Sequence, residues 1–255
     1  MSEAGTKPKL YLLDVEGTTS PVSLVYEQLF PYARKHLEKF LRAEVREPWV
    51  DVQIAADLTL LAKENAAEVR GADSDTPLLT APGEGESWET AIPEAAAYLR
   101  WLMDRDRKST ALKSLQGRIW RVGFEGRELT GTMFADVPTA LAKWSREARV
   151  AIYSSGSVEA QQLLFRYSSA DDLTPYLSAY FDTRVGAKTS ADSYRAIAAA
   201  MQVTPQEIVF VSDVLRELDP AREAGLQTRL SLREGNAPVA DRHTHTAIRS
   251  FVEIV

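Results

Sequence analysis

The chain of 255 residues contains no cysteine and few histidines, and it has no long apolar run. Without cysteine, disulfide bonds, thiolate–zinc sites and cysteine nucleophiles are excluded. A helix that crosses a bilayer needs about 18 or more consecutive apolar residues, and none of the apolar runs reaches that length. The first nine residues are polar and lack the apolar core of a signal peptide. We therefore expect a cytoplasmic protein that has no membrane partner.

An excess of positive charge is also missing. The chain has 30 basic and 36 acidic residues, which gives a formal net charge of −6. This balance predicts no broad basic surface, so nucleic acid is not expected as a partner. An anionic substrate would have to be attracted locally, by a bound cation or by a few placed donors. Hydrophobic residues make up 45% of the chain, which is ample for a globular core and excludes a mainly disordered protein.

Short apolar runs that end in polar residues give the first indication of the fold. The strongest runs are residues 9–14, 149–155 and 207–213, and weaker ones are 179–182 and 227–232. Runs of this length and apolarity are typical of buried parallel strands. Amphipathic helical patterns lie between them, at 158–167, 194–201 and 215–224. The alternation predicts an α/β fold with a doubly wound parallel sheet.

The stretch from 20 to 135 has a different pattern. It contains helical periodicities over 26–41, 54–69 and 88–103, and no strong strand run. Residues 71–86 are rich in Gly, Pro, Asp and Ser, which predicts a connector. We therefore expect a mainly helical domain, residues 20–135, inserted into a core domain made of residues 1–19 and 136–255.

Polar residues follow the predicted strands at their carboxyl ends, where open parallel sheets bind ligands. Carboxylates, hydroxyls and an ammonium group are all represented, and such a set suits a phosphate group and a divalent cation better than a structural core. The candidates are Asp14, Glu16, Ser154, Ser155, Lys188 and Asp213.

Each candidate also has an ordinary structural interpretation. Asp14 precedes a Gly-Thr pair and fits a solvated turn, while residues 154–157 fit a helix start after a glycine turn. Lys188 fits a solvated loop, and Asp213 fits a helix N-cap. Glu217 fits either a residue that orients the waters of a metal ion or one that complements the helix dipole.

The order of these groups along the chain resembles the four motifs of the haloacid dehalogenase superfamily, with Glu16 where that superfamily usually has Asp. Longer segments resemble one branch, the enolase-phosphatase or acireductone synthase family of methionine salvage. They are Asp14-Val-Glu-Gly-Thr-Thr19, Phe30-Pro-Tyr32, Leu115-Gln-Gly-x-Ile-Trp120, Ile152-Tyr-Ser-Ser-Gly-Ser-Val-Glu-Ala-Gln161, Phe181-Asp-Thr183 and Ser212-Asp-Val-x-Arg-Glu217. The inserted helical domain lies where the superfamily carries a cap.

The resemblance implies a role for each candidate. Asp14 would be the nucleophile and a metal ligand, and Asp213 the second carboxylate ligand. Glu16 would be the general acid/base and would bind the metal through its main-chain carbonyl. The two serines, Ser154 and Ser155, and Lys188 would bind substrate.

The resemblance also implies a reaction. A monomer with one Mg²⁺ per chain would convert 2,3-diketo-5-methylthiopentyl-1-phosphate to the acireductone 1,2-dihydroxy-3-keto-5-methylthiopentene and phosphate, by enolisation and then dephosphorylation. Two alternatives stay open. One is a phosphatase of the same superfamily that acts on another small phosphate monoester, and the other is a non-catalytic phosphoprotein-binding scaffold.

A His-x-His pair at His243 and His245 admits a second metal site. Since no third ligand is apparent in the sequence, we interpret this pair as part of a solvated helix start.

Overall fold

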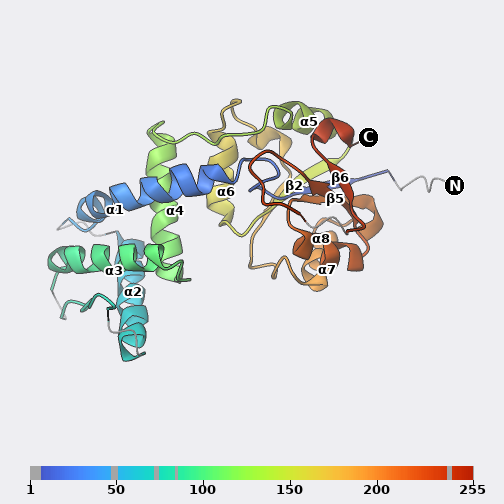
Figure 1. The fold of residues 1–255 in the computed structure, drawn as a ribbon. Coiled ribbons are helices and arrows are strands. Elements are labelled where there is room, and N and C mark those ends of the chain that lie inside the picture. The colour runs from blue at the N-terminus through green and yellow to red at the C-terminus, as the bar shows by residue number, and fades with distance from the viewer. Residues whose placement is uncertain (1–6, 47–50, 72–74, 84–85, 240–242, 255) are drawn as a thin grey trace. The chain divides into compact units, whose positions relative to one another are not determined.

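The computed structural model describes residues 7–46, 51–71, 75–83, 86–239 and 243–254. The chain forms two compact units, one of residues up to 26 together with 127 onward, and one of residues 27–126 (Figure 1). Both predicted domain boundaries, after residue 19 and before residue 136, fall inside the first unit. Within the described ranges, no helix has both the length and the apolarity that a bilayer crossing requires.

The first unit is built on a six-stranded parallel sheet with strand order β3-β2-β1-β4-β5-β6. This arrangement confirms the predicted doubly wound sheet. The strands are β1 (Leu10–Leu13), β2 (Arg149–Tyr153), β3 (Ala179–Phe181), β4 (Ile208–Ser212), β5 (Gln227–Ser231) and β6 (Thr246–Ile248).

Helices cover both faces of this sheet. They are α5 (Val137–Trp144), α6 (Val158–Arg166), α7 (Ala191–Ala200) and α8 (Leu215–Glu223), with short 3₁₀ turns at Thr174–Tyr176, Pro205–Glu207 and Phe251–Glu253. On one face Leu10 and Leu12 pack in a buried cluster with α7 and α8. On the other face Tyr11 stacks on Trp144 of α5, with ring centroids 4.2 Å apart. Alternate residues of β1 thus point to opposite apolar layers, as expected of a central parallel strand.

The register of the central strands brings their carboxyl ends to one edge. Leu13 lies opposite Ile152 of β2 and Val211 of β4. The backbone N–H of Asp14 continues the ladder by donating to the Val211 carbonyl at 3.0 Å. The residues after β1, β2 and β4 are therefore neighbours in space, although they lie far apart in the sequence.

The second unit is helical, as the sequence predicts. It contains α1 (Phe30–Glu44), α2 (Val52–Arg70), a 3₁₀ turn (Trp88–Ala91), α3 (Ile92–Asp104) and α4 (Thr110–Glu125), and a π-helix (Leu24–Leu29) precedes α1. Apolar side chains of the four α-helices form one buried core. Helix α2 is capped by Asp51, whose carboxylate accepts hydrogen bonds from the N–H groups of Gln53 and Ile54.

Helix α4 lies where no helix was predicted. Three glycines between 115 and 129 argue against a helix, because glycine lowers helix propensity. The helix forms because Ser109 caps it, accepting from the Leu112 N–H at 3.0 Å, and because Leu112, Leu115 and Ile119 are buried on one face.

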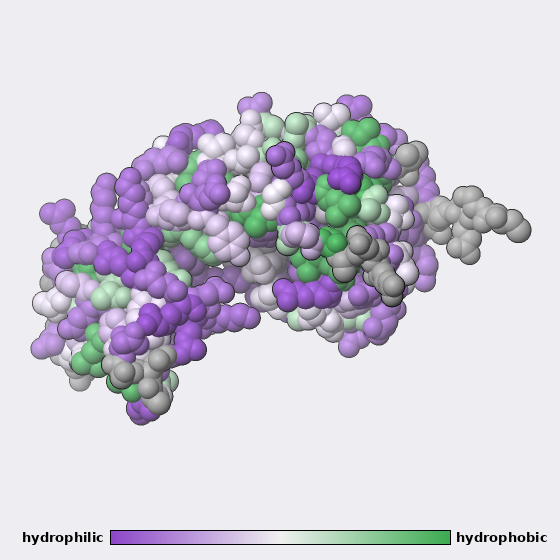
Figure 2. All heavy atoms as spheres, viewed as in Figure 1, coloured by the Kyte–Doolittle hydropathy of each residue, from purple (hydrophilic) through white to green (hydrophobic). Residues whose placement is uncertain are grey.

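On the viewed face of the molecule, hydrophilic residues dominate the surface and hydrophobic residues form separate patches (Figure 2).

Candidate active site at the carboxyl edge of the sheet

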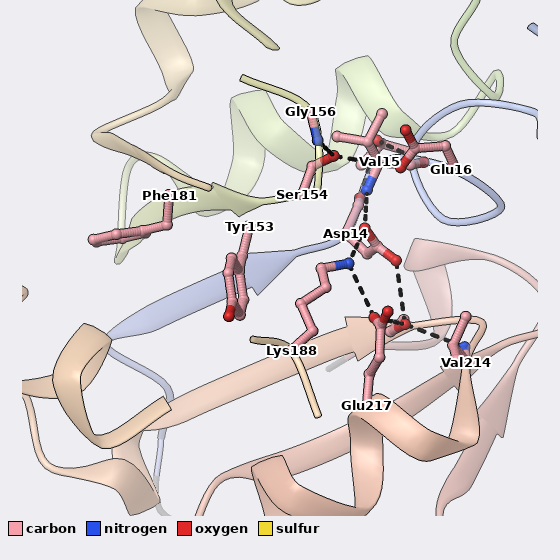
Figure 3. A network of polar contacts seen from close by, with 12 residues as sticks. Asp14, Val15, Glu16, Tyr153, Ser154, Gly156, Phe181, Lys188, Val214 and Glu217 are labelled. Carbon is pink, nitrogen blue, oxygen red and sulfur yellow. Dashed lines mark hydrogen bonds and ion pairs between the residues drawn. The ribbon is translucent and has the colours of Figure 1, made fainter. Parts of the chain in front are cut away.

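Several of the predicted site residues meet at the carboxyl edge of the central strands (Figure 3). Asp14 and Glu16 follow β1, Ser154 follows β2, and Lys188 lies in the loop between β3 and α7. Asp213 follows β4. The predicted convergence of charged and hydroxyl groups is therefore present in the structure.

Asp14 is held in one orientation. Its side chain is buried, with the residue 3% exposed. The N–H of Val15 donates to Oδ1 at 2.7 Å, and the ammonium group of Lys188 forms an ion pair with the same oxygen. The hydroxyl of Ser212 lies 3.3 Å from Oδ2. Oδ1 thus carries the two strong donors, while Oδ2 has one long contact and is the freer oxygen.

Lys188 is a buried cation held by two acids. Its Nζ pairs with Asp14 and with Oε2 of Glu217, the latter at 2.9 Å, and lies 5.7 Å from the centre of the Tyr153 ring. Burial by itself would lower the pKa of Lys188, but the two carboxylates outweigh burial and raise the pKa above its ordinary value. The side chain therefore remains an ammonium group at neutral pH.

Glu16 lies on the same edge in a different environment. The hydroxyl of Ser154 donates to its Oε2 at 3.4 Å. Burial, and then the nearby charge of Asp14, raise the pKa of Glu16, although Lys188 acts in the opposite direction. A raised pKa favours the protonated form of the carboxyl group, which is the form that a general acid needs.

Asp213 is a third acid on this edge whose neutral form is favoured. Burial and the charge of Asp14 raise its pKa to about 7. Its Oδ2 lies so close to Gly17 that a Cβ on this glycine would be 2.4 Å away. Gly17 also has φ +69°, which favours glycine, so Asp213 can approach the loop only because this residue has no side chain.

These carboxylates fit a divalent cation. Asp14 and Asp213 supply hard oxygen donors, and their mutual repulsion is relieved when a cation lies between them. Among the described residues, no group of three or more His, Asp or Glu side chains is arranged to hold a metal ion. The pair of Asp14 and Asp213 nevertheless suits Mg²⁺, because this ion is bound by one or two carboxylates and keeps several water or phosphate oxygens.

The loop after β2 provides hydroxyl and backbone donors. The N–H of Gly156 donates to Ser154 Oγ at 3.1 Å, and Ser157 caps α6 by accepting from the Ala160 N–H at 3.2 Å. Gln161 of α6 also fixes the loop, because its Nε2 donates to the carbonyl of Gly156. Ser155 is exposed, whereas Ser154 is buried. The helix-start interpretation is thus correct for Ser157, while Ser154 contacts Glu16.

The contacts of two site residues, Glu217 and Ser212, were not predicted from the sequence. Glu217 pairs with Lys188, a contact that neither interpretation of this residue included. The hydroxyl of Ser212 lies within hydrogen-bond distance of both Glu217, at 3.0 Å, and Asp14. The side chain of Asp213 does not serve as the cap of α8, because the N-cap residue is Val214 and has no side-chain cap. Ser212 could have been found from the strand register, which places it beside Asp14.

The interpretation of the His-x-His pair as a solvated helix start is wrong. His245 is buried, with Nδ1 2.7 Å from the Thr228 hydroxyl and Nε2 3.1 Å from Asp219. The segment leads into strand β6 and not into a helix. His245 therefore joins β5, α8 and the approach to β6.

The fold and this edge define a class of protein. The family model for haloacid dehalogenase-like hydrolases matches residues 8–225, and the chain belongs to this family of enzymes. This match confirms the resemblance that was based on the order of the motifs along the chain.

The relatives define the branch. The chain is 49% identical over 244 residues to Enolase-phosphatase E1 of Synechococcus elongatus, covering 95% of this chain and 96% of that protein. It is 42% identical over 247 residues to Enolase-phosphatase E1 of Drosophila persimilis, covering 95% and 93%. The crystal structure of the UTR4 protein of Saccharomyces cerevisiae matches with a TM-score of 0.72 and 30% identity, covering 97% of this chain and all of that one. Within the hydrolases, the chain belongs to the enolase-phosphatase E1 family.

Proposed function

We propose that the chain is a Mg²⁺-dependent enolase-phosphatase of methionine salvage. It would convert 2,3-diketo-5-methylthiopentyl-1-phosphate to 1,2-dihydroxy-3-keto-5-methylthiopentene and phosphate. The observation that carries the proposal is the buried Asp14 carboxylate, which is fixed by Lys188 and the Val15 N–H and which adds to burial in raising the pKa of the nearby Glu16. The names of the relatives support the choice of substrate.

Asp14 is the nucleophile in this proposal. Its freer oxygen, Oδ2, would attack phosphorus and form an aspartyl-phosphate as the bond from phosphorus to the substrate oxygen breaks. Glu16 would give its proton to that leaving oxygen. It would then remove a proton from the water that attacks phosphorus and regenerates Asp14. The raised pKa of Glu16 suits both halves of this cycle.

The charges explain why a cation is needed. A phosphate monoester brings about −1.5 to −2 charges, and Asp14 and Asp213 add two more. Lys188 would offset one of these charges and bind a phosphate oxygen. Mg²⁺, held by Asp14, Asp213 and the main-chain carbonyl of Glu16, would neutralise developing charge on the phosphoryl group when bound. Ser154 and Ser155 would bind the remaining substrate oxygens.

Glu16 is one methylene longer than the Asp that the superfamily usually carries. We infer that this reach lets it act on the carbon skeleton during enolisation. Glu16→Asp is expected to slow enolisation by up to about 10²-fold, because a small displacement of a catalytic group is costly. Absorbance of the enediol, recorded beside phosphate release, separates the two steps. Full turnover of both steps by the variant would count against this role.

The alternative within the family is a phosphatase for another small phosphate monoester. A panel of phosphate monoesters assayed beside the diketo phosphate, with and without Mg²⁺, distinguishes the two. We expect the diketo phosphate to have the highest kcat/KM and an enediol signal before phosphate appears. A scaffold without activity would release no phosphate from any of them.

The helical unit is proposed to be the cap of the active site, and the protein a cytoplasmic monomer. These proposals are supported by the family resemblance. Light scattering on the eluting protein tests the oligomeric state, with a mass near 28.3 kDa expected.

A further inference from the structure

The chain returns to the active-site loop after β5. The hydroxyl of Ser231 donates to the carbonyl of Gly17 at 3.0 Å. The side-chain amide of Asn236 donates to the same carbonyl at 2.9 Å and to the carbonyl of Ser231 at 3.2 Å. Two side chains from outside the loop thus hold the backbone that follows Asp14 and Glu16.

These contacts fix which way the amide of Asn236 points. Carbonyl oxygens accept hydrogen bonds and do not donate them, so the NH₂ group must face Gly17 and Ser231. The other end of the amide, Oδ1, is buried and has no hydrogen-bond partner among the described residues. A buried carbonyl oxygen normally has a donor, so this oxygen calls for an explanation.

The position of Oδ1 points to the cation site. A Cβ on Gly17 would lie 2.8 Å from Asn236 Oδ1 and 2.4 Å from Asp213 Oδ2. Both oxygens therefore crowd the same side of Gly17, and the amide oxygen and the ionised Asp213 carboxylate are both acceptors. Two acceptors that face one small region need a donor between them. A water molecule bound to a cation can be that donor.

We propose that Asn236 is a positioning residue of the cation site. Its Nδ2 fixes the carbonyl of Gly17, and its Oδ1 accepts a hydrogen bond from a water molecule bound to the cation that Asp213 would hold. Water on a divalent cation is a strong donor, and groups that orient such ligands contribute to metal affinity. The inference rests on the proposed function, because it assumes that cation.

Metal binding without substrate provides the test. Mg²⁺ is titrated by calorimetry into metal-free wild type, Asn236→Ala and the matched control Ser231→Ala. Both variants lose one donor to the Gly17 carbonyl, but only Asn236→Ala loses Oδ1. We expect Asn236→Ala to weaken Mg²⁺ binding by about 10–100-fold, and Ser231→Ala to stay close to wild type.

The outcomes separate this inference from the proposed function. Equal Mg²⁺ affinity in wild type and Asn236→Ala overturns the role of Asn236 alone. Equal weakening in both variants also overturns it, because anchoring of the loop would then suffice. A wild type that does not bind Mg²⁺ overturns the cation site itself. Melting curves without metal check folding, and Asn236→Leu, which keeps the side-chain size, replaces the alanine variant if that one unfolds.

Discussion

Buried polar side chains occur in both units, but their surroundings differ. In the helical unit Asp57 accepts from the Ser114 hydroxyl at 2.7 Å and from Gln53 at 3.1 Å. Asn65 donates to the Pro77 carbonyl at 2.7 Å and accepts from the Leu79 N–H at 2.9 Å. These groups find their donors and acceptors within the unit, so they serve the fold.

At the carboxyl edge of the sheet, the acidic side chains outnumber the basic ones that contact them. Four acids, Asp14, Glu16, Asp213 and Glu217, lie near the ammonium group of Lys188, and only Asp14 and Glu217 of these form ion pairs with it. Burial and mutual repulsion raise the pKa of Glu16, Asp213 and Glu217. The difference teaches that polar groups which satisfy one another stabilise the structure, whereas a cluster left short of positive charge is suited to bind a cation and a reacting anion.

A buried ion pair elsewhere in the sheet unit sharpens the contrast. Arg233 donates to Asp136 at 3.0 Å, and the N–H of Phe251 and the hydroxyl of Ser250 donate to the same carboxylate. Burial would raise the pKa of Asp136, but these donors outweigh it and lower the pKa. Burial of a carboxylate therefore does not by itself mark the active site. The feature that marks it is the excess of acidic over basic side chains.

The largest effect is expected for Asp14→Asn. Loss of the nucleophile should reduce phosphate release by at least about 10³-fold, as for other nucleophiles. The variant removes a charge that repels Asp213, but it also removes the ion pair with the buried Lys188. Thermal melting therefore separates loss of the nucleophile from loss of folded protein. The measurements are steady-state phosphate release and thermal melting. If Asp14→Asn released phosphate as fast as wild type, the acid cluster at the sheet edge would not be the active site.

Glu217→Gln should have an intermediate effect. The variant removes one of the two charges that hold Lys188 in place, so we expect kcat/KM to fall by about 10–100-fold, the usual cost of a displaced active-site group. Arg195→Gln, an exposed ion-pair residue on α7, serves as the control and should be neutral. Equal activity of both variants would show that Glu217 does not position Lys188.

Asp57→Ala should change stability and not chemistry. It leaves the hydroxyl of Ser114 without its partner in a part-buried position, at a cost of about 1–3 kcal/mol in the free energy of unfolding. Activity per folded molecule should be unchanged. Denaturant unfolding and phosphate release together check this prediction. An activity loss without a stability loss would contradict the structural role.

The last prediction concerns the pH dependence of stability. The pKa of Asp213 is raised to about 7 in the folded state, whereas its ordinary value is 3.8. The folded state therefore binds more protons than the unfolded state between these values, so its stability falls as pH rises through this window. Mg²⁺ should oppose that loss by binding the ionised carboxylates. Melting temperatures between about pH 4 and 7 test this, with EDTA and with Mg²⁺. Asp213→Asn, as control, should flatten the metal-free profile.

Much of the fold followed from the sequence, because central strands are continuous apolar runs. Residues 9–14 and 207–213 contain β1 and β4. Strand β6 was missed because it has three residues, two of them exposed. Helix α4 was missed because its glycines obscure a buried face that only packing reveals.

The site was partly predictable for a similar reason. Asp14 and Lys188 could be brought together because ligands bind at the carboxyl edge of a parallel sheet. The contact between Glu217 and Lys188 depends on side-chain reach, which spacing does not give. Asn236 lies in a loop without any pattern that singles it out. Its connection to the site is the hydrogen bond to the Gly17 carbonyl and the closeness of its Oδ1 to Gly17.

The most direct test of the account is to look for phosphate on Asp14. The enzyme is mixed with ³²P-labelled diketo phosphate and Mg²⁺, quenched in acid within one turnover and digested. The account predicts a hydroxylamine-labile label on the peptide that contains Asp14, formed only with Mg²⁺ and absent from Asp14→Asn. Turnover without a label on the protein, or a label on another residue, would contradict it.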